Sequence, residues 1–162
     1  MTDYIKQVCT VAKQLSHSGR LSQTKYHMQH GDVPVYKHCL AVAVCSLKLA
    51  DFWKLDIDSD SLIRGALLHD YFLYDWHDSS VCLNWHGFVH PKKALANAQE
   101  DFDLNDLEKD IIVHHMFPLN LSPPRSKEAW LVCIADKLCA ITETVKGRKR
   151  RQVSTHTPSV NA

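Results

Sequence analysis

A histidine and an aspartate stand side by side where a mostly apolar segment ends. His69 and Asp70 directly follow residues 62–68, which read Leu-Ile-Arg-Gly-Ala-Leu-Leu. Imidazole and carboxylate groups are strong metal ligands, and their burial is costly unless something replaces their lost hydration. A divalent metal ion would replace it, so the pair predicts a metal site. Further candidate ligands lie far away along the chain, at His38, His90, His114, His115 and Asp136.

These candidates interrupt the apolar faces of predicted helices. His38 shares a helical face with Val42, and His114 and His115 follow Ile111 by three and four residues. Residues at such spacings lie on one side of a helix, so these side chains are expected to face inward. One inward histidine would be ordinary. Five segments that each bring an inward ligand favour one shared metal site.

Apolar residues recur at a helical period along most of the chain, and no segment reads as a convincing strand. The predicted fold is all-α, a compact bundle of about six helices. Asp60 or Ser61 is expected to cap the third helix, Asn105 with Glu108 resembles a capping box, and Ser126 is expected to cap the last helix. The predicted helices cover residues 3–16, 34–53, 61–71, 90–102, 105–116 and 126–145, with an aromatic loop at 72–87.

Size and charge predict one domain with a distinct C-terminus. The chain has 162 residues, of which 45% are hydrophobic, enough for one sizeable core. Residues 146–162 carry five basic residues and no acidic one, which leaves 14 basic against 18 acidic residues elsewhere. We expect a domain over 1–146, ended by Gly147, and a basic, disordered tail over 147–162. Because the rest of the chain is net acidic, it is not expected to bind nucleic acid.

The sequence also predicts where the protein works. No apolar run approaches the roughly 18–20 residues that span a bilayer, and the first 16 residues do not resemble a signal peptide. The six cysteines form no Cys-x-x-Cys pair, so no zinc-ribbon spacing is present. We therefore expect a cytoplasmic protein without a membrane partner.

The order His, His-Asp, His, His-His, Asp resembles the HD-domain metal-dependent phosphohydrolase superfamily. The resemblance covers roughly residues 30–145 and implies an HD-type helical fold. It is carried by Tyr36-Lys37-His38, Leu67-Leu68-His69-Asp70, Phe88-Val89-His90-Pro91, Ile112-Val113-His114-His115 and Ile134-Ala135-Asp136-Lys137.

The resemblance implies one or two divalent transition metal ions. In the one-metal version the ligands would be His38, His69, Asp70 and Asp136. The later histidines favour the two-metal version, in which Asp70 bridges to a second ion held by His90 and by His114 or His115. Mixed imidazole and carboxylate ligation suits iron, manganese, cobalt, nickel or zinc. With Asp70 and His69 as the catalytic pair, a metal-bound hydroxide would then cleave a phosphate ester or anhydride.

The substrate is expected to be a small phosphorylated metabolite, most simply a nucleotide. Many two-metal relatives continue the pair with Ile-Gly-Lys, whose lysine reaches phosphate, whereas this chain continues with Tyr71-Phe72-Leu73. The Gly-Tyr-Pro signature of the cyclic-di-guanylate branch is also missing. Rings of the aromatic loop could either stack on a base or close the core. The cations predicted to contact phosphate instead are Lys92, Lys93, Arg125 and Lys137.

Three alternatives stay open at this point. A non-catalytic sensor would bind nucleotide and metal without turnover, and the missing lysine favours it slightly. An HD-fold di-iron oxygenase would use the same ligands for redox chemistry. A helical adaptor would carry these histidines without any metal. The sequence does not specify the oligomeric state.

Overall fold

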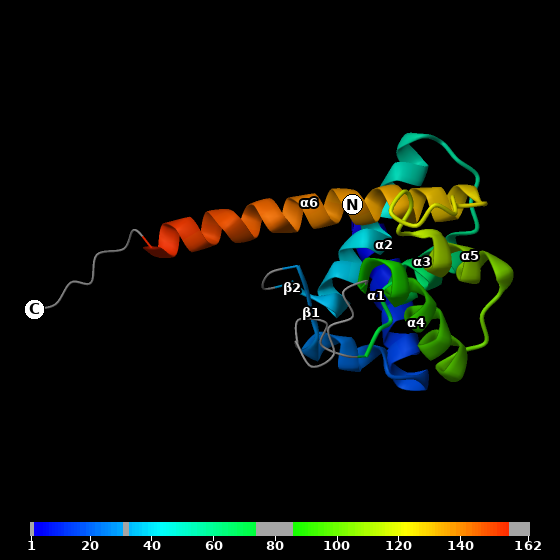
Figure 1. Cartoon of the computed structure of the whole chain (residues 1–162). Coiled ribbons are helices and arrows are strands. Elements are labelled where there is room, and N and C mark those ends of the chain that lie inside the picture. Colours follow the sequence, from blue (N-terminus) through cyan, green and yellow to red (C-terminus); the bar gives the residue numbers. More distant parts are fainter. Residues whose placement is uncertain (1, 31–32, 74–85, 156–162) are drawn as a thin grey trace, which may run out of the picture.

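The computed structural model describes residues 2–30, 33–73 and 86–155 (Figure 1). The described chain is mostly helical, with one short two-stranded sheet, which confirms the predicted all-α fold. Its elements are α1 (Thr2–Ser18), the 3-10 helix η1 (Leu21–Tyr26), β1 (Met28–His30), β2 (Val33–Pro34), α2 (Val35–Phe52), α3 (Ser59–Leu68), α4 (His86–Asp101), α5 (Asp106–His114) and α6 (Lys127–Thr155).

Helix α2 lies at the centre of the bundle and packs against α1, α3 and α6, while α5 packs against α3, α4 and α6. The core between them is built from aliphatic residues such as Val42, Leu62, Leu67 and Ile111, all at most 1% exposed. In Figure 1 the first part of α6 lies on this bundle, and its later part extends away from the other helices. None of the helices in the described ranges combines the length and apolar character that a bilayer span requires.

Local capping chemistry sets where three of the helices begin. Asn105 and Glu108 form the predicted capping box of α5, and the Ser126 hydroxyl accepts from the Ala129 amide as predicted for α6. The predicted cap of α3 was wrong, because Asp58 rather than Asp60 or Ser61 accepts from the Ser61 amide. An aspartate three residues before an amide can accept from it, and this geometry moves the start of α3 to Ser59.

The structure differs from the predicted elements at three further places. Residues 28–34 contain a short antiparallel pair, β1 with β2, where no strand was expected. Helix α4 begins at His86, so Pro91 lies inside it. Helix α6 continues through Gly147 to Thr155, although Gly147 was expected to end it near Val145. A single glycine costs a helix about 1 kcal/mol, and the lysines and arginines beside it are good helix formers.

Two expectations fall partly outside the described residues. The aromatic loop is described only at its start, where Tyr71 and Phe72 are fully buried. Its remaining predicted stacking residues, Tyr74 and Trp76, lie outside the described ranges, as do residues 156–162 of the predicted tail. Whether residues 147–162 form a unit separate from the domain stays a prediction.

Gly65 allows α3 and α5 to approach closely, and it supports our first prediction. A Cβ atom added there would lie 2.6 Å from Cδ1 and 2.9 Å from Cβ of Ile111. Gly65→Ala is expected to lower the free energy of unfolding by about 1–3 kcal/mol through overpacking. Urea denaturation would measure this loss in the free energy of unfolding. The loss should be smaller when Gly65→Ala is introduced into an Ile111→Ala variant, because part of the contacting side chain is then absent. Gly147→Ala is the matched control, because no heavy atom lies within 4 Å of its added Cβ. An equal loss of stability in the parent and in the Ile111→Ala variant would show that overpacking against Ile111 is not the cause.

Candidate metal centre

Six of the predicted ligands converge in the interior of the bundle, around the carboxylate of Asp70. They come from five helices or their ends, and none is more than 7% exposed. His69 takes the C-cap position of α3 and Asp70 follows it, so both side chains leave the helix where α2, α5 and α6 meet α3. The six residues are His38, His69, Asp70, His90, His115 and Asp136.

One oxygen of Asp70 faces a first group of ligands, which we call the first lobe. Asp70 Oδ2 lies 3.2 Å from His69 Nε2 and 3.9 Å from His38 Nε2. Asp136 Oδ1 completes this lobe, at 3.0 Å from His38 Nε2 and 3.8 Å from His69 Nε2. His38, His69 and Asp136 therefore place one ligand atom each within 4.8 Å of one another.

The other oxygen of Asp70 faces a second lobe. Asp70 Oδ1 lies 3.2 Å from His90 Nε2 and 3.5 Å from His115 Nε2. The two imidazole nitrogens are themselves 2.9 Å apart. The carboxylate thus has one oxygen toward each lobe, which is the arrangement of a bridging ligand.

Hydrogen bonds at the far side of three rings orient the imidazoles. His69 Nδ1 bonds to the Ala66 carbonyl and His115 Nδ1 to the Ile112 carbonyl, each at 2.8 Å. A carbonyl can only accept, so Nδ1 carries a proton in both rings, and in the neutral form of each ring Nε2 has a lone pair toward the site. His38 Nδ1 lies 3.0 Å from Glu143 Oε2. A carboxylate or carbonyl behind a histidine is the usual support of a metal-ligating imidazole.

The residues present fit a bound cation. Within the described part of the chain, His69 Nε2 and Asp70 Oδ1 are buried and have no hydrogen-bond partner. A buried polar atom without a partner is costly, and native proteins rarely leave one. Both atoms are strong metal ligands that point into the lobes, so a divalent ion would satisfy them.

The electrostatics of the centre keep its carboxylates ionised. Burial alone would raise the pKa of Asp70, but the imidazoles of His69, His115 and His90 hold it well below its usual range. Burial likewise opposes ionisation of Asp136, and the rings of His38 and His69 lower its pKa. Burial lowers the pKa of His115, which favours the neutral ligand form of that ring.

His38 leads to a prediction about pH. Burial lowers its pKa, but the carboxylates of Asp136 and Glu143 outweigh burial and raise it to about 10 from the ordinary 6.5. The raised pKa stabilises the metal-free fold below pH 6.5, and this contribution is lost as the pH rises toward 10. A metal ion must displace the proton, so cobalt(II) binding at pH 7 should release about one proton from His38.

Calorimetric titration in two buffers with different heats of ionisation would measure this release. The binding enthalpy should differ between the buffers, and affinity should rise with pH up to about 10. The same titration of His114→Gln should retain the release. A binding enthalpy independent of the buffer would contradict the prediction.

The structure does not bring His114 to the centre. Its Nδ1 lies 2.7 Å from Asp110 Oδ1, and Asp110 also accepts from the backbone and hydroxyl of Ser126. The following residue, His115, reaches Asp70 instead. Adjacent residues on a helix point about 100° apart, so only one of the two can face the lobes.

The predicted phosphate-binding cations lie in different surroundings. Lys137 Nζ donates to the carbonyls of His115 and Cys133, at 2.9 and 3.2 Å, so this ammonium holds the end of α5. Arg125 is exposed in the loop before α6, and its amide donates to Asp110. Lys92 is exposed and Lys93 half-buried, two and three residues after His90 on α4.

Two residues that contact the ligands were not predicted from the sequence. Glu143 lies seven residues after Asp136 on α6, a two-turn spacing that places both on one face and could have indicated it. Gln29 Nε2 donates to Asp70 Oδ2 at 2.5 Å. Gln29 belongs to β1, in a segment interpreted as a polar connector, and no sequence signal marked it.

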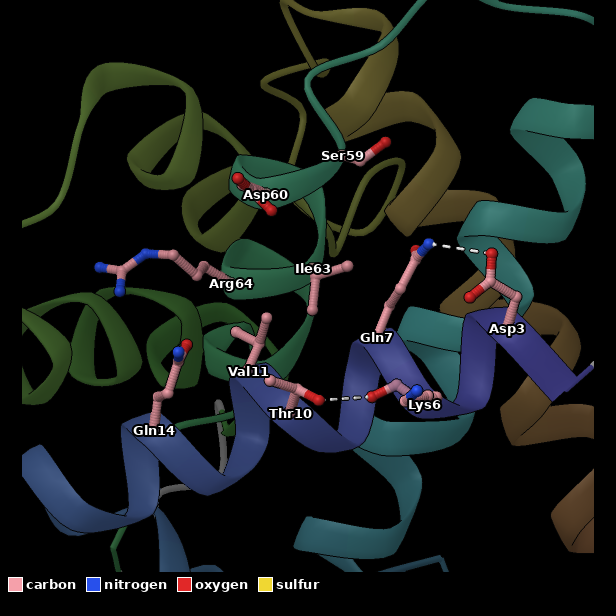
Figure 2. Close-up of a pocket in the computed structure, with 10 residues that line it drawn as sticks. All are labelled: Asp3, Lys6, Gln7, Thr10, Val11, Gln14, Ser59, Asp60, Ile63 and Arg64. Carbon is pink, nitrogen blue, oxygen red and sulfur yellow. Dashed lines mark hydrogen bonds between the residues drawn. The ribbon is translucent and has the colours of Figure 1, made fainter.

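Two hollows of the described structure lie apart from the lobes. Figure 2 shows the first, of about 690 Å³, between α1 and the start of α3. Its labelled lining includes Asp3, Gln7 and Arg64 but no residue of the metal centre. A second hollow, of about 400 Å³ between α2 and α6, reaches the centre only through Glu143, behind His38.

Comparison with known proteins adds one finding. A family model described as HD domain matches residues 35–141, which include all six converging ligands. No curated protein and no solved structure was found to match the chain.

Proposed function

The chain belongs to the HD domain family, and from this we propose that it is a metal-dependent phosphohydrolase. The proposed reaction is hydrolysis of a phosphate ester or anhydride in a small phosphorylated metabolite, most simply a nucleotide. The proposed cofactor is a pair of divalent ions of iron, manganese, cobalt, nickel or zinc, because the ligands mix imidazole with carboxylate.

The position of Asp70 is the observation that carries this proposal. Its two oxygens face separate lobes, at 3.2 Å from His69 Nε2 on one side and 3.2 Å from His90 Nε2 on the other. A carboxylate placed in this way could help to hold a cation in each lobe, and two neighbouring cations would stabilise both the attacking and the leaving oxygen in hydrolysis. His38, His69 and Asp136 would hold the first ion, and His90 and His115 the second.

The protein groups prepare the centre for this chemistry. Two bound divalent ions would supply an activated water and would stabilise negative charge on the attacking and leaving oxygens. Burial of all six ligands excludes bulk water from the lobes, and the surrounding imidazoles keep Asp70 ionised. The Lys137 ammonium donates to the His115 carbonyl and so helps to hold the His115 imidazole in place at the end of α5.

The substrate phosphate would be met by cations outside the lobes. Lys92 and Lys93 follow His90 on α4, and Arg125 lies on the loop anchored by Asp110. The bonds that Lys137 makes within the protein favour a supporting role for that residue over direct contact with phosphate.

Elemental analysis followed by a substrate panel tests the proposal. The protein would be purified without chelator or nickel resin, and phosphate release from nucleotides and sugar phosphates would be measured with manganese, iron, cobalt, nickel and zinc. We expect bound metal and release that chelator abolishes and added metal restores. Protein without metal affinity and without release under every ion would contradict the proposal.

A nucleotide sensor is the second candidate, and the residues after the His-Asp pair favour it. Tyr71 and Phe72 are fully buried, and the Tyr71 hydroxyl donates to Asp101 at 2.6 Å, so this segment joins the core instead of offering a cation to phosphate. A sensor would bind nucleotide in the same panel and release no phosphate. Dioxygen consumption by the reduced iron form would instead indicate an oxygenase.

A further inference from the structure

Gln29 is a buried amide at the edge of the first lobe. It lies in β1, which packs against α2 and α6, the helices that carry His38 and Asp136. Alternation along the strand turns Gln29 inward at 8% exposure, while the preceding Met28 is 39% exposed. A short strand therefore adds a polar side chain to a centre otherwise built by helices.

The two ends of this amide are in different situations. Nε2 donates to Asp70 Oδ2 at 2.5 Å. The reverse orientation would oppose two acceptor oxygens at that distance, so the nitrogen must face the carboxylate. Oε1 is then left buried, with no hydrogen-bond partner among the described residues.

An orphaned carbonyl oxygen needs a partner, and none of the residues in the described ranges provides one. In its neutral ligand form the His69 ring has its proton on Nδ1, which donates to Ala66, so the ring has no second N–H for this oxygen. The missing partner must be a hydrogen-bond donor or a cation, and a metal ion in the first lobe, or a water molecule bound to it, would serve. Oxygen ligands from amides are ordinary partners of divalent ions.

We propose that Gln29 is a positioning residue of the metal centre, an inference that rests on the proposed function. Its N–H group occupies one lone pair of Asp70 Oδ2 and so directs the carboxylate to face both lobes. Its Oε1 binds the first-lobe cation, directly or through a water ligand. The amide thereby links the orientation of the bridging carboxylate to occupation of the first lobe.

Gln29→Leu tests this role because it preserves size and removes both polar atoms. Cobalt(II) would be titrated into chelator-treated protein and followed by calorimetry and by its visible absorption. We expect the Kd for cobalt(II) to rise about 10–100-fold, the usual effect of removing a group that supports a metal ligand. The Tm of the metal-free variant should stay close to that of the parent, because the loss of the hydrogen bond to Asp70 Oδ2 and the removal of an orphaned buried carbonyl act in opposite directions.

The Kd for cobalt(II) and the metal-free Tm of Gln29→Leu together distinguish a positioning role from a merely structural one. A structural role would lower the metal-free Tm and leave the Kd unchanged, and that result would overturn the proposal. A changed cobalt(II) spectrum at saturation would indicate direct ligation by Oε1, and an unchanged spectrum with weaker binding would indicate a water link. Gln23→Leu, an exposed glutamine on η1, is the matched control and should behave like the parent.

Gln29→Glu tests the contribution of the Oε1 oxygen to metal binding separately from that of the N–H group. It keeps an acceptor at Oε1 but places a second carboxylate beside Asp70, so its metal-free Tm should fall below that of Gln29→Leu. Its cobalt(II) affinity should exceed that of Gln29→Leu, and an affinity no better would overturn the role of the oxygen. A parent protein that binds no cobalt(II) would refute the proposed function, whereas parental affinity in Gln29→Leu would refute only this inference.

Discussion

Replacing Asp70 by asparagine is expected to remove metal from both lobes and to abolish phosphate release. One oxygen of Asp70 faces each lobe, so a single substitution takes a charged ligand from both proposed ions. Loss of about 4 kcal/mol of transition-state stabilisation corresponds to a rate roughly a thousandfold lower. Metal content by elemental analysis and phosphate release at saturating metal would measure the two effects.

The same substitution also has a stability cost that must be separated from the catalytic one. Asp70 is 1% exposed and is surrounded by imidazoles, and removing one partner of a buried charge cluster typically costs about 3–5 kcal/mol. Circular dichroism would establish that the variant is folded, and Asp136→Asn would provide a second variant confined to the first lobe. Asp60→Asn, at an exposed position on α3, is the matched control. Parental metal content and parental rates in Asp70→Asn would refute the bridging role.

Replacing His115 and replacing His114 are expected to have very different effects on the metal content of the protein. His115→Gln should lower the metal content by about one ion per chain, because His115 Nε2 lies 3.5 Å from Asp70 Oδ1 and 2.9 Å from His90 Nε2 in the second lobe. His114→Gln should leave the metal content unchanged, since that ring bonds to Asp110 instead. Its expected effect is a loss of about 1 kcal/mol of stability from one hydrogen bond.

Metal titrations of the two variants side by side would decide between one ion and two. If both substitutions lowered the metal content equally, the assignment of His115 over His114 would be wrong. If neither did, the second lobe would not hold a metal ion, and the one-metal version of the site would remain. Phosphate release measured on the same samples would show whether catalysis needs the second ion.

Much of the fold could be predicted because it depends on local chemistry. Helical periodicity located the helices, and the Asn105–Glu108 capping box was found because both of its bonds lie within four residues. The continuation of α6 past Gly147 was missed because a glycine is compatible with either outcome. The strand pair at 28–34 was missed because its residues satisfy each other through backbone bonds, which carry no residue signature.

Residue types and helical periodicity were enough to indicate which side chains could ligate a metal and on which helical faces they lie. The packing of the helices was needed to show that Asp70 has one oxygen toward each lobe, that His115 rather than His114 reaches it, and that Gln29 and Glu143 join the centre. The reason is physical: periodicity and capping act within a few residues, whereas a distance between ligand atoms depends on how helices dock. The approach of α5 to α3 over Gly65 is one such docking contact, and nothing in either segment alone specifies it.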